Sequence, residues 1–268
     1  MSRSSRLSPP LGGRPWRAFV AQTRWEARLA LRRSENLLVT FGVPILLLVV
    51  FSAVPLLPAG ARPGGPVGPT VGVLETLVPA VLAVAVISTG LVALGISTAY
   101  ERSYGVLKRL LGSPLPRWAL LAAKVVVVGA TLLIQVLLVG AVASVLGWSP
   151  PSGPVAALLA ALPWLLLGTI CFSALGLLLA GRLRPESVLA VANGLFLVLL
   201  LLGGVLIPLG ALPAILAGPA SLLPSALLAE LLRGTMQPGG AVDPLQAAGL
   251  GAWSIGLAAA AVAWFRID

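Results

Sequence analysis

The sequence contains no histidine and only one cysteine, Cys171, and just 10% of its 268 residues are charged. A soluble globular domain carries roughly 25% charged residues, so this composition excludes a water-soluble fold. A single cysteine cannot form an internal disulfide, and Cys171 lies in an apolar run, where we expect a packed thiol. The lack of histidine removes the commonest general base and metal ligand.

Apolar residues are what the sequence has in excess, since they make up 58% of the chain. They occur in stretches of about 20 residues or more, the length of helix that crosses the ~30 Å hydrocarbon layer of a membrane. Because lipid offers no hydrogen bonds, only helices and closed barrels can span it, and alternating strand-length segments are not seen here. We therefore predict an all-α integral membrane protein with six transmembrane helices. The predicted spans are residues 37–57, 71–99, 119–146, 155–180, 187–207 and 245–265.

Three further segments have their own character. Residues 1–14 are rich in Ser, Pro, Gly and Arg, which predicts a disordered cytoplasmic tail. Residues 15–34 have the pattern of an amphipathic interfacial helix, with a plain basic tail as the alternative. Residues 35–268 then form a single transmembrane domain, in which the proline-broken apolar stretch 208–244 predicts a re-entrant or interfacial hairpin before the sixth span. The predicted interfacial helix has Trp16, Phe19 and Val20 on its apolar face, flanked by Arg17, Arg24 and Arg28.

Basic residues are unevenly divided between the two ends of the predicted spans. Sixteen of the 18 Lys and Arg lie before the first span or after the second, fourth and sixth; Arg62 and Arg233 lie on the other side. The positive-inside rule therefore places both termini in the cytoplasm. The net charge of +10 is then a signal of topology and of anionic lipid, and we do not expect nucleic-acid binding. The richness in Arg and Ala favours a bacterial cytoplasmic (inner) membrane.

A charged segment, residues 100–116, separates the second and third spans. Its central residues 103–111 predict a short helix, which the following Gly, Ser and Pro residues would end. A short helix on the cytoplasmic membrane surface can receive force from a soluble partner and pass it to both adjoining spans. The alternative is a solvated loop that only sets topology.

This segment resembles the signature of the membrane subunits of type-2 ABC transporters, the ABC-type-2 permease family. The sequence differs from that signature at Ser103, Val106 and Lys108. Together with the interfacial helix, the six spans and the broken hairpin, the resemblance covers residues 15–268. The matching positions are Glu101, Arg102, Gly105, Leu107, Leu110, Ser113, Pro114 and Lys124.

The resemblance implies a half-transporter that pairs with a second permease subunit, identical or homologous. Two cytosolic ABC ATPase subunits would dock on the 100–116 segment and the N-terminal helix. The chain lacks a Gly-x-x-x-x-Gly-Lys-Ser/Thr phosphate loop, because neither Lys108 nor Lys124 follows a glycine. We therefore expect no enzyme activity and no cofactor in this chain, with ATP and Mg²⁺ on the partner. The residues expected to couple to the ATPase are Glu101, Arg102, Gly105, Leu107, Lys108, Arg109, Leu110, Ser113 and Pro114.

Polar residues inside the predicted spans are few. Gln135 and Asn193 lie at mid-span and either line a pathway or bond between helices, while Glu75 and Lys124 lie near span ends, where they can stay wet. Gln135, Asn193 and Glu75 are the candidate pathway residues. An ion-coupled carrier would place acids or histidines at mid-depth. We therefore predict a permease that exports an amphipathic or lipid-like compound, with a secondary carrier or channel not coupled to ATP as the alternative.

Overall fold

The computed structural model describes residues 15–32, 34–53, 72–107, 117–205, 209 and 213–265, and their regular elements are helices. The tail 1–14 lies outside the described residues. The elements are α1 (Pro15–Arg32), α2 (Ser34–Ala53), α3 (Val73–Ile87), the π-helix η1 (Ser88–Ala93), α4 (Leu94–Ser103), α6 (Arg117–Val145), α7 (Pro154–Ala180), α8 (Pro185–Leu202), α9 (Ala214–Ser221), α10 (Pro224–Met236) and α11 (Pro244–Trp264).

Five helical stretches are long and apolar enough to cross a membrane: α3 through α4, α6, α7, α8 and α11. The pair formed by α9 and α10 is bent by 79° and would count as a sixth if it is one broken span. This bent pair lies where the sequence predicts a hairpin. Helix α2 occupies residues 37–53 of the first predicted span, 37–57. The predicted all-α membrane architecture is therefore confirmed.

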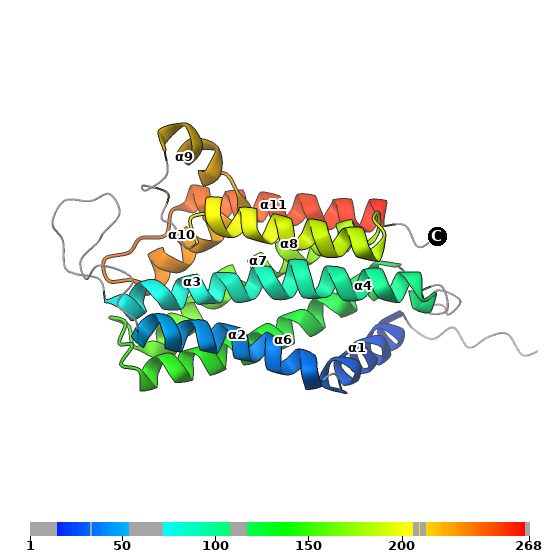
Figure 1. The fold of residues 1–268 in the computed structure, drawn as a ribbon, viewed down its shortest axis with the longest axis horizontal. Coiled ribbons are helices and arrows are strands. Elements are labelled where there is room, and N and C mark those ends of the chain that lie inside the picture. Colours follow the sequence, from blue (N-terminus) through cyan, green and yellow to red (C-terminus); the bar gives the residue numbers. More distant parts are fainter. Residues whose placement is uncertain are drawn as a thin grey trace, which may run out of the picture.

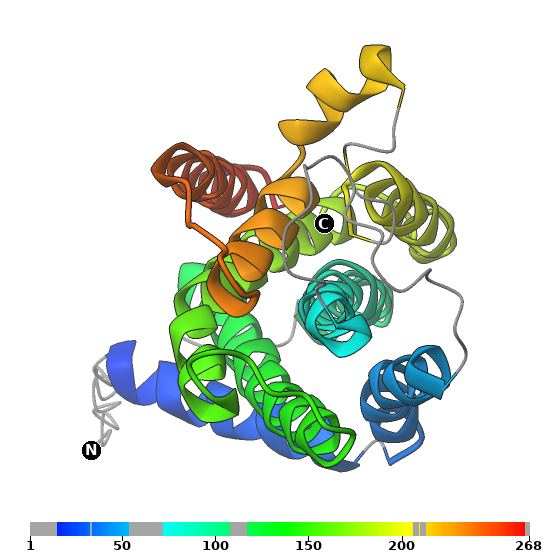
Figure 2. The ribbon, with the colours of Figure 1, turned by 90° about the vertical axis from the view of Figure 1, so that its left-hand side faces the viewer.

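The two ends of the helix bundle differ. Helix α1, the end of α4 and the end of α11 lie at one end, whereas α9 lies at the other (Figure 1). Viewed along the bundle, α1 runs across the direction of the other helices (Figure 2). This is the orientation expected of a helix that lies along a membrane surface.

The continuous helix formed by α3, η1 and α4 occupies the centre of the bundle (Figure 2). In its most apolar window 83% of the residues are buried, against 39% or less in the other four candidate spans. All residues from Leu77 to Ile87 are buried, so this part of the helix has no lipid-facing side. A helix that is apolar all round is covered either by lipid or by protein, and here protein covers it. The other helices are therefore arranged around this one.

The middle of the central helix widens into the π-helix η1, which the sequence analysis did not predict. There the Leu94 N–H donates to the Thr89 carbonyl, five residues earlier. The wide turn presents the Gly90 and Leu91 carbonyls to Gly176 of α7; a Cβ built on Gly176 would lie only 2.7 Å and 2.8 Å from these two oxygens. Close backbone contact through small residues is how helices pack tightly in membranes.

The C-terminal end of the second span also differs from the prediction. The sequence analysis ends that span at residue 99 and places a separate short helix at 103–111. In the structure, α4 continues without a break to Ser103 and the chain turns at Tyr104 and Gly105. Helix resumes at Val106 and Leu107, within the range predicted for the short helix. No residue before Gly105 interrupts a helix, so the spanning helix extends beyond the apolar run. Residues 108–116 lie outside the described part of the chain.

We predict that Gly176→Ala destabilises the bundle. The added methyl would meet backbone oxygens, which cannot rotate away, and overpacking of this kind costs about 1–3 kcal/mol. The measurement is the thermal midpoint of the detergent-purified protein. Gly194→Ala on α8 is the matched control, because a Cβ there has no atom within 4 Å. Equal midpoints for the two variants would contradict the prediction.

Candidate functional site: a buried ion-pair cluster

Three helices meet around the ammonium of Lys124. Lys124 lies near the start of α6, Glu101 near the end of α4, and Glu26 on α1. Helix α1 packs against α6, so an acid on this face of α1 meets a base on α6. We call Glu26, Lys124 and Glu101 the ion-pair cluster.

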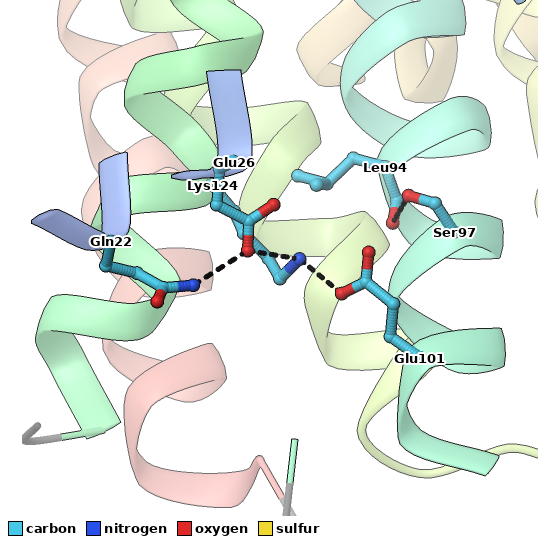
Figure 3. Close-up of polar contacts among 6 residues, drawn as sticks. All are labelled: Gln22, Glu26, Leu94, Ser97, Glu101 and Lys124. Carbon is cyan, nitrogen blue, oxygen red and sulfur yellow. Dashed lines mark hydrogen bonds and ion pairs between the residues drawn. The ribbon is translucent and has the colours of Figure 1, made fainter. Parts of the chain in front are cut away.

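Lys124 is held between the two carboxylates (Figure 3). Its Nζ lies 2.5 Å from Glu101 Oε2 and 3.0 Å from Glu26 Oε1. The Gln22 amide Nε2 donates to the same Glu26 oxygen at 3.0 Å. The Lys124 side chain is only 2% exposed, and the glutamates are 11% and 15% exposed.

Burial decides how the ion-pair cluster acts. An exposed pair contributes little to stability, because water screens it. A buried ammonium without a partner is very costly, so Lys124 holds both glutamates in place as long as it is charged. The cluster therefore fixes α1 and the end of α4 to α6.

Two features of this arrangement were not predicted from the sequence. Lys124 was expected to remain hydrated near a span end, but α1 and α4 cover it and leave it 2% exposed. Glu26, the acid within the otherwise basic segment 15–34, was not singled out. The sequence did contain a signal for this role: Glu26 is four residues after Gln22, so the two side chains share one face of a helix and can form a hydrogen bond.

The residues around the ion-pair cluster make further ties at this end of the bundle. An Arg102 guanidinium nitrogen donates to the Leu183 carbonyl at 2.5 Å, joining α4 to the turn after α7. Leu107 is fully buried in an apolar cluster with residues of α6, α7 and α11. The rings of Phe19 and Trp118 stack with their centroids 6.5 Å apart, which joins α1 to α6 a second time.

The expected coupling residues are only partly described. Glu101 belongs to the ion-pair cluster, and Gly105 adopts a left-handed conformation with φ of +73° directly after α4. The remaining expected residues lie outside the described part of the chain. These are Lys108, Arg109, Leu110, Ser113 and Pro114.

Two of the arginines predicted to flank the apolar face of α1 are exposed. Arg24 and Arg28 are exposed, while Phe19 and Val20 are partly buried. Trp25, which did not fit the predicted apolar face, is 55% exposed beside these arginines. Trp16 and Arg17 lie in α1, but their side chains are outside those that the structure describes.

The three candidate pathway residues lie apart from one another. Gln135 is 1% exposed; its amide donates to the Thr40 carbonyl at 2.7 Å, and its oxygen accepts from the Thr89 hydroxyl at 3.3 Å. Gln135 thus joins α2, η1 and α6. Asn193 is exposed on α8 and donates to the Leu189 carbonyl of its own helix. Glu75 accepts from the Gly72 N–H at the start of α3, at the opposite end of the bundle from the ion-pair cluster. Their role in a pathway stays a prediction.

The described helices define a multi-pass membrane protein whose spans surround a buried central helix. Residues 17–236 match the family model described as ABC-2 type transporter. The chain therefore belongs to the ABC-2 type transporter family and is an ABC transporter permease component. No curated protein matches it significantly. Within the described residues, no group of three or more His, Cys, Asp or Glu side chains could hold a metal ion.

We predict that Lys124→Met lowers the free energy of unfolding by about 3–5 kcal/mol, because it leaves two buried carboxylates without a cation. Thermal unfolding in detergent measures the loss. The matched comparison is the triple variant Lys124→Met, Glu26→Gln and Glu101→Gln, which removes all three charges together. We expect this variant to recover most of the lost stability. A single variant as stable as the wild type, or a triple variant no better than the single one, would contradict the prediction.

Proposed function

We propose that the chain is the membrane subunit of an ABC exporter driven by a separate cytosolic ATPase. The observation that carries the proposal is the ion-pair cluster. It joins α1 to α4. From the family resemblance we expect the ATPase to dock on α1 and on the segment that follows α4. A force applied at the segment after Gly105 would therefore reach three helices together.

The central helix offers a route for this force into the membrane. Helix α4 continues through η1 into α3, so movement of its end is passed to the buried centre of the bundle. A single π-helical turn inside an α-helix is frequently found at a functional site. In this proposal the ATPase moves α4 with α1 and α6, and η1 takes up the change in angle.

The charge distribution supports the orientation. Arg24 and Arg28 on α1, and Arg182 and Arg184 after α7, lie at the end of the bundle that holds the ion-pair cluster. We assign this end to the cytoplasm by the positive-inside rule, with both termini on that side. The proposed location is the bacterial cytoplasmic (inner) membrane.

The described spans favour an amphipathic or lipid-like cargo. The acids near α8 and α11 lie at the helix starts, Glu186 in the first turn of α8 and Asp243 before α11. Helices α6 and α7 contain none. An ion-coupled carrier would use charged groups at mid-depth. We propose that ATP and Mg²⁺ bind two copies of the partner ATPase, and that a second permease subunit, identical or homologous, completes the pathway.

We predict that Gly105→Ala reduces the ATP hydrolysis that accompanies transport, while membrane insertion is retained. The left-handed φ of +73° suits glycine, and a Cβ there costs about 1–2 kcal/mol, so the segment after α4 would shift. The measurement is cargo-stimulated ATPase activity of the co-purified complex in vesicles.

Gly147→Ala is the matched control. Gly147 also has a positive φ, +96°, and an added Cβ would meet no atom within 4 Å, as at Gly105, but it lies in the α6–α7 turn at the opposite end of the bundle. We expect this control to retain coupled activity. Equal activities in the two variants would argue against coupling at Gly105. Transport by the permease alone, driven by an ion gradient, would overturn the proposed function.

A further inference from the structure

A groove runs along α11 on the outside of the bundle, next to the elbow between α9 and α10. Its volume is about 970 Å³, within the ~300–1,000 Å³ range of small-molecule sites. The Trp253 indole Nε1 donates to the Leu222 carbonyl at 3.0 Å and so ties α11 to the elbow. Leu227 of α10 also lines the groove and is 8% exposed.

The polarity of the groove changes along its length. Asp243 and Gln246 lie at the end where α11 begins, and the residues further along α11 that line the groove are small or apolar. Ser221 is next to Leu222, whose carbonyl meets Trp253 further along α11. Asp243 is the one charged residue among the described residues that line it. Its Oδ1 accepts from the Leu245 N–H at 2.8 Å, and Oδ2 remains for a ligand.

The length of the groove corresponds to one leaflet. From Asp243 to Gly256, α11 rises ~20 Å at ~1.5 Å per residue. Half of a bilayer including its headgroups is also ~20 Å thick. Because Asp243 precedes a membrane-spanning helix, it lies at headgroup depth, and the groove ends near the bilayer centre.

We propose that this groove binds a phospholipid with a primary-amine headgroup, such as phosphatidylethanolamine. The ammonium donates to the Asp243 carboxylate in a charge-assisted hydrogen bond, and one acyl chain lies along Ala252, Trp253 and Gly256. An anionic lipid without an amine would be repelled by Asp243. A quaternary ammonium has no N–H to donate, so phosphatidylcholine would bind less tightly.

A second helix is the competing occupant, because Ala248, Ala252 and Gly256 repeat at the four-residue spacing that helix pairs use. A spanning helix, however, needs contact across the whole ~30 Å of hydrocarbon. The groove covers about one leaflet and has a carboxylate at one end. This length and polarity match a lipid with a charged headgroup better than they match a spanning helix. The proposed lipid is resident and requires neither ATP nor the ATPase.

The test is quenching of Trp253 fluorescence in phosphatidylcholine vesicles that contain a lipid brominated midway along its acyl chain. Brominated phosphatidylethanolamine, phosphatidylcholine and phosphatidylglycerol are compared, and the difference between the wild type and Trp253→Phe isolates Trp253. We expect half-maximal quenching by phosphatidylethanolamine at a roughly tenfold lower mole fraction than by the other two lipids. Asp243→Asn, which keeps a helix-capping side chain, should abolish this preference.

Gly256→Leu should fill the groove and reduce the quenching, because a Cβ at Gly256 meets no atom within 4 Å and the variant is expected to fold. Gly251→Leu is the matched control on the same helix, since its Cβ also has open space but Gly251 does not line the groove. Equal quenching by the three lipids, unchanged in Asp243→Asn, would overturn the proposal. Shielding of Trp253 from all three lipids would overturn it in favour of a second copy of the chain. Because no nucleotide is present, neither result bears on the proposed ATP coupling.

Discussion

A buried ammonium ion needs anionic partners, and this requirement at Lys124 organises one end of the protein. Glu101 and Glu26 both approach Lys124, from α4 and from α1, because water is excluded there. The two carboxylates come from segments far apart in the chain, so the tertiary fold is needed to bring them together. The N-terminal helix, which would otherwise lie loosely on the membrane, becomes part of the bundle.

The same end of the bundle is joined to its centre by one continuous helix. The residues of α3 are covered on all sides, so neighbouring helices must accommodate any rotation or shift of this helix. The backbones of the π-helix η1 and Gly176 of α7 pack closely against each other. The ion-pair cluster at the end of α4 and the close packing of η1 against Gly176 together restrict how α4 can move. This restriction is what a subunit driven from outside the membrane requires.

Hydropathy and charge along the chain were sufficient to predict the helical membrane class and the ranges in which spanning helices occur, and the signature around Glu101 and Gly105 indicated the family. Each depends on segment composition, which local sequence carries. The π-helix η1 was not predicted, and its close packing against Gly176 is a contact with a distant helix that the local sequence does not show. The burial of Lys124 and the role of Glu26 were missed for the same reason, since α1 had to be placed against α6 first. Gln135 was recognised as a mid-span amide, but its contacts with Thr40 and Thr89 come only from the packing.

The order of residues in the ion-pair cluster has a consequence for biogenesis. Glu26 leaves the ribosome first, Glu101 follows, and Lys124 comes last. Until Lys124 is made, neither glutamate has the cation that later neutralises it, so both must remain hydrated at the membrane surface. The entry of α6 into the membrane is therefore the step at which the N-terminal helix can dock. A nascent chain that stops before α6 lacks both Lys124 and Trp118, the two residues of α6 that contact Glu26 and Phe19 of the N-terminal helix.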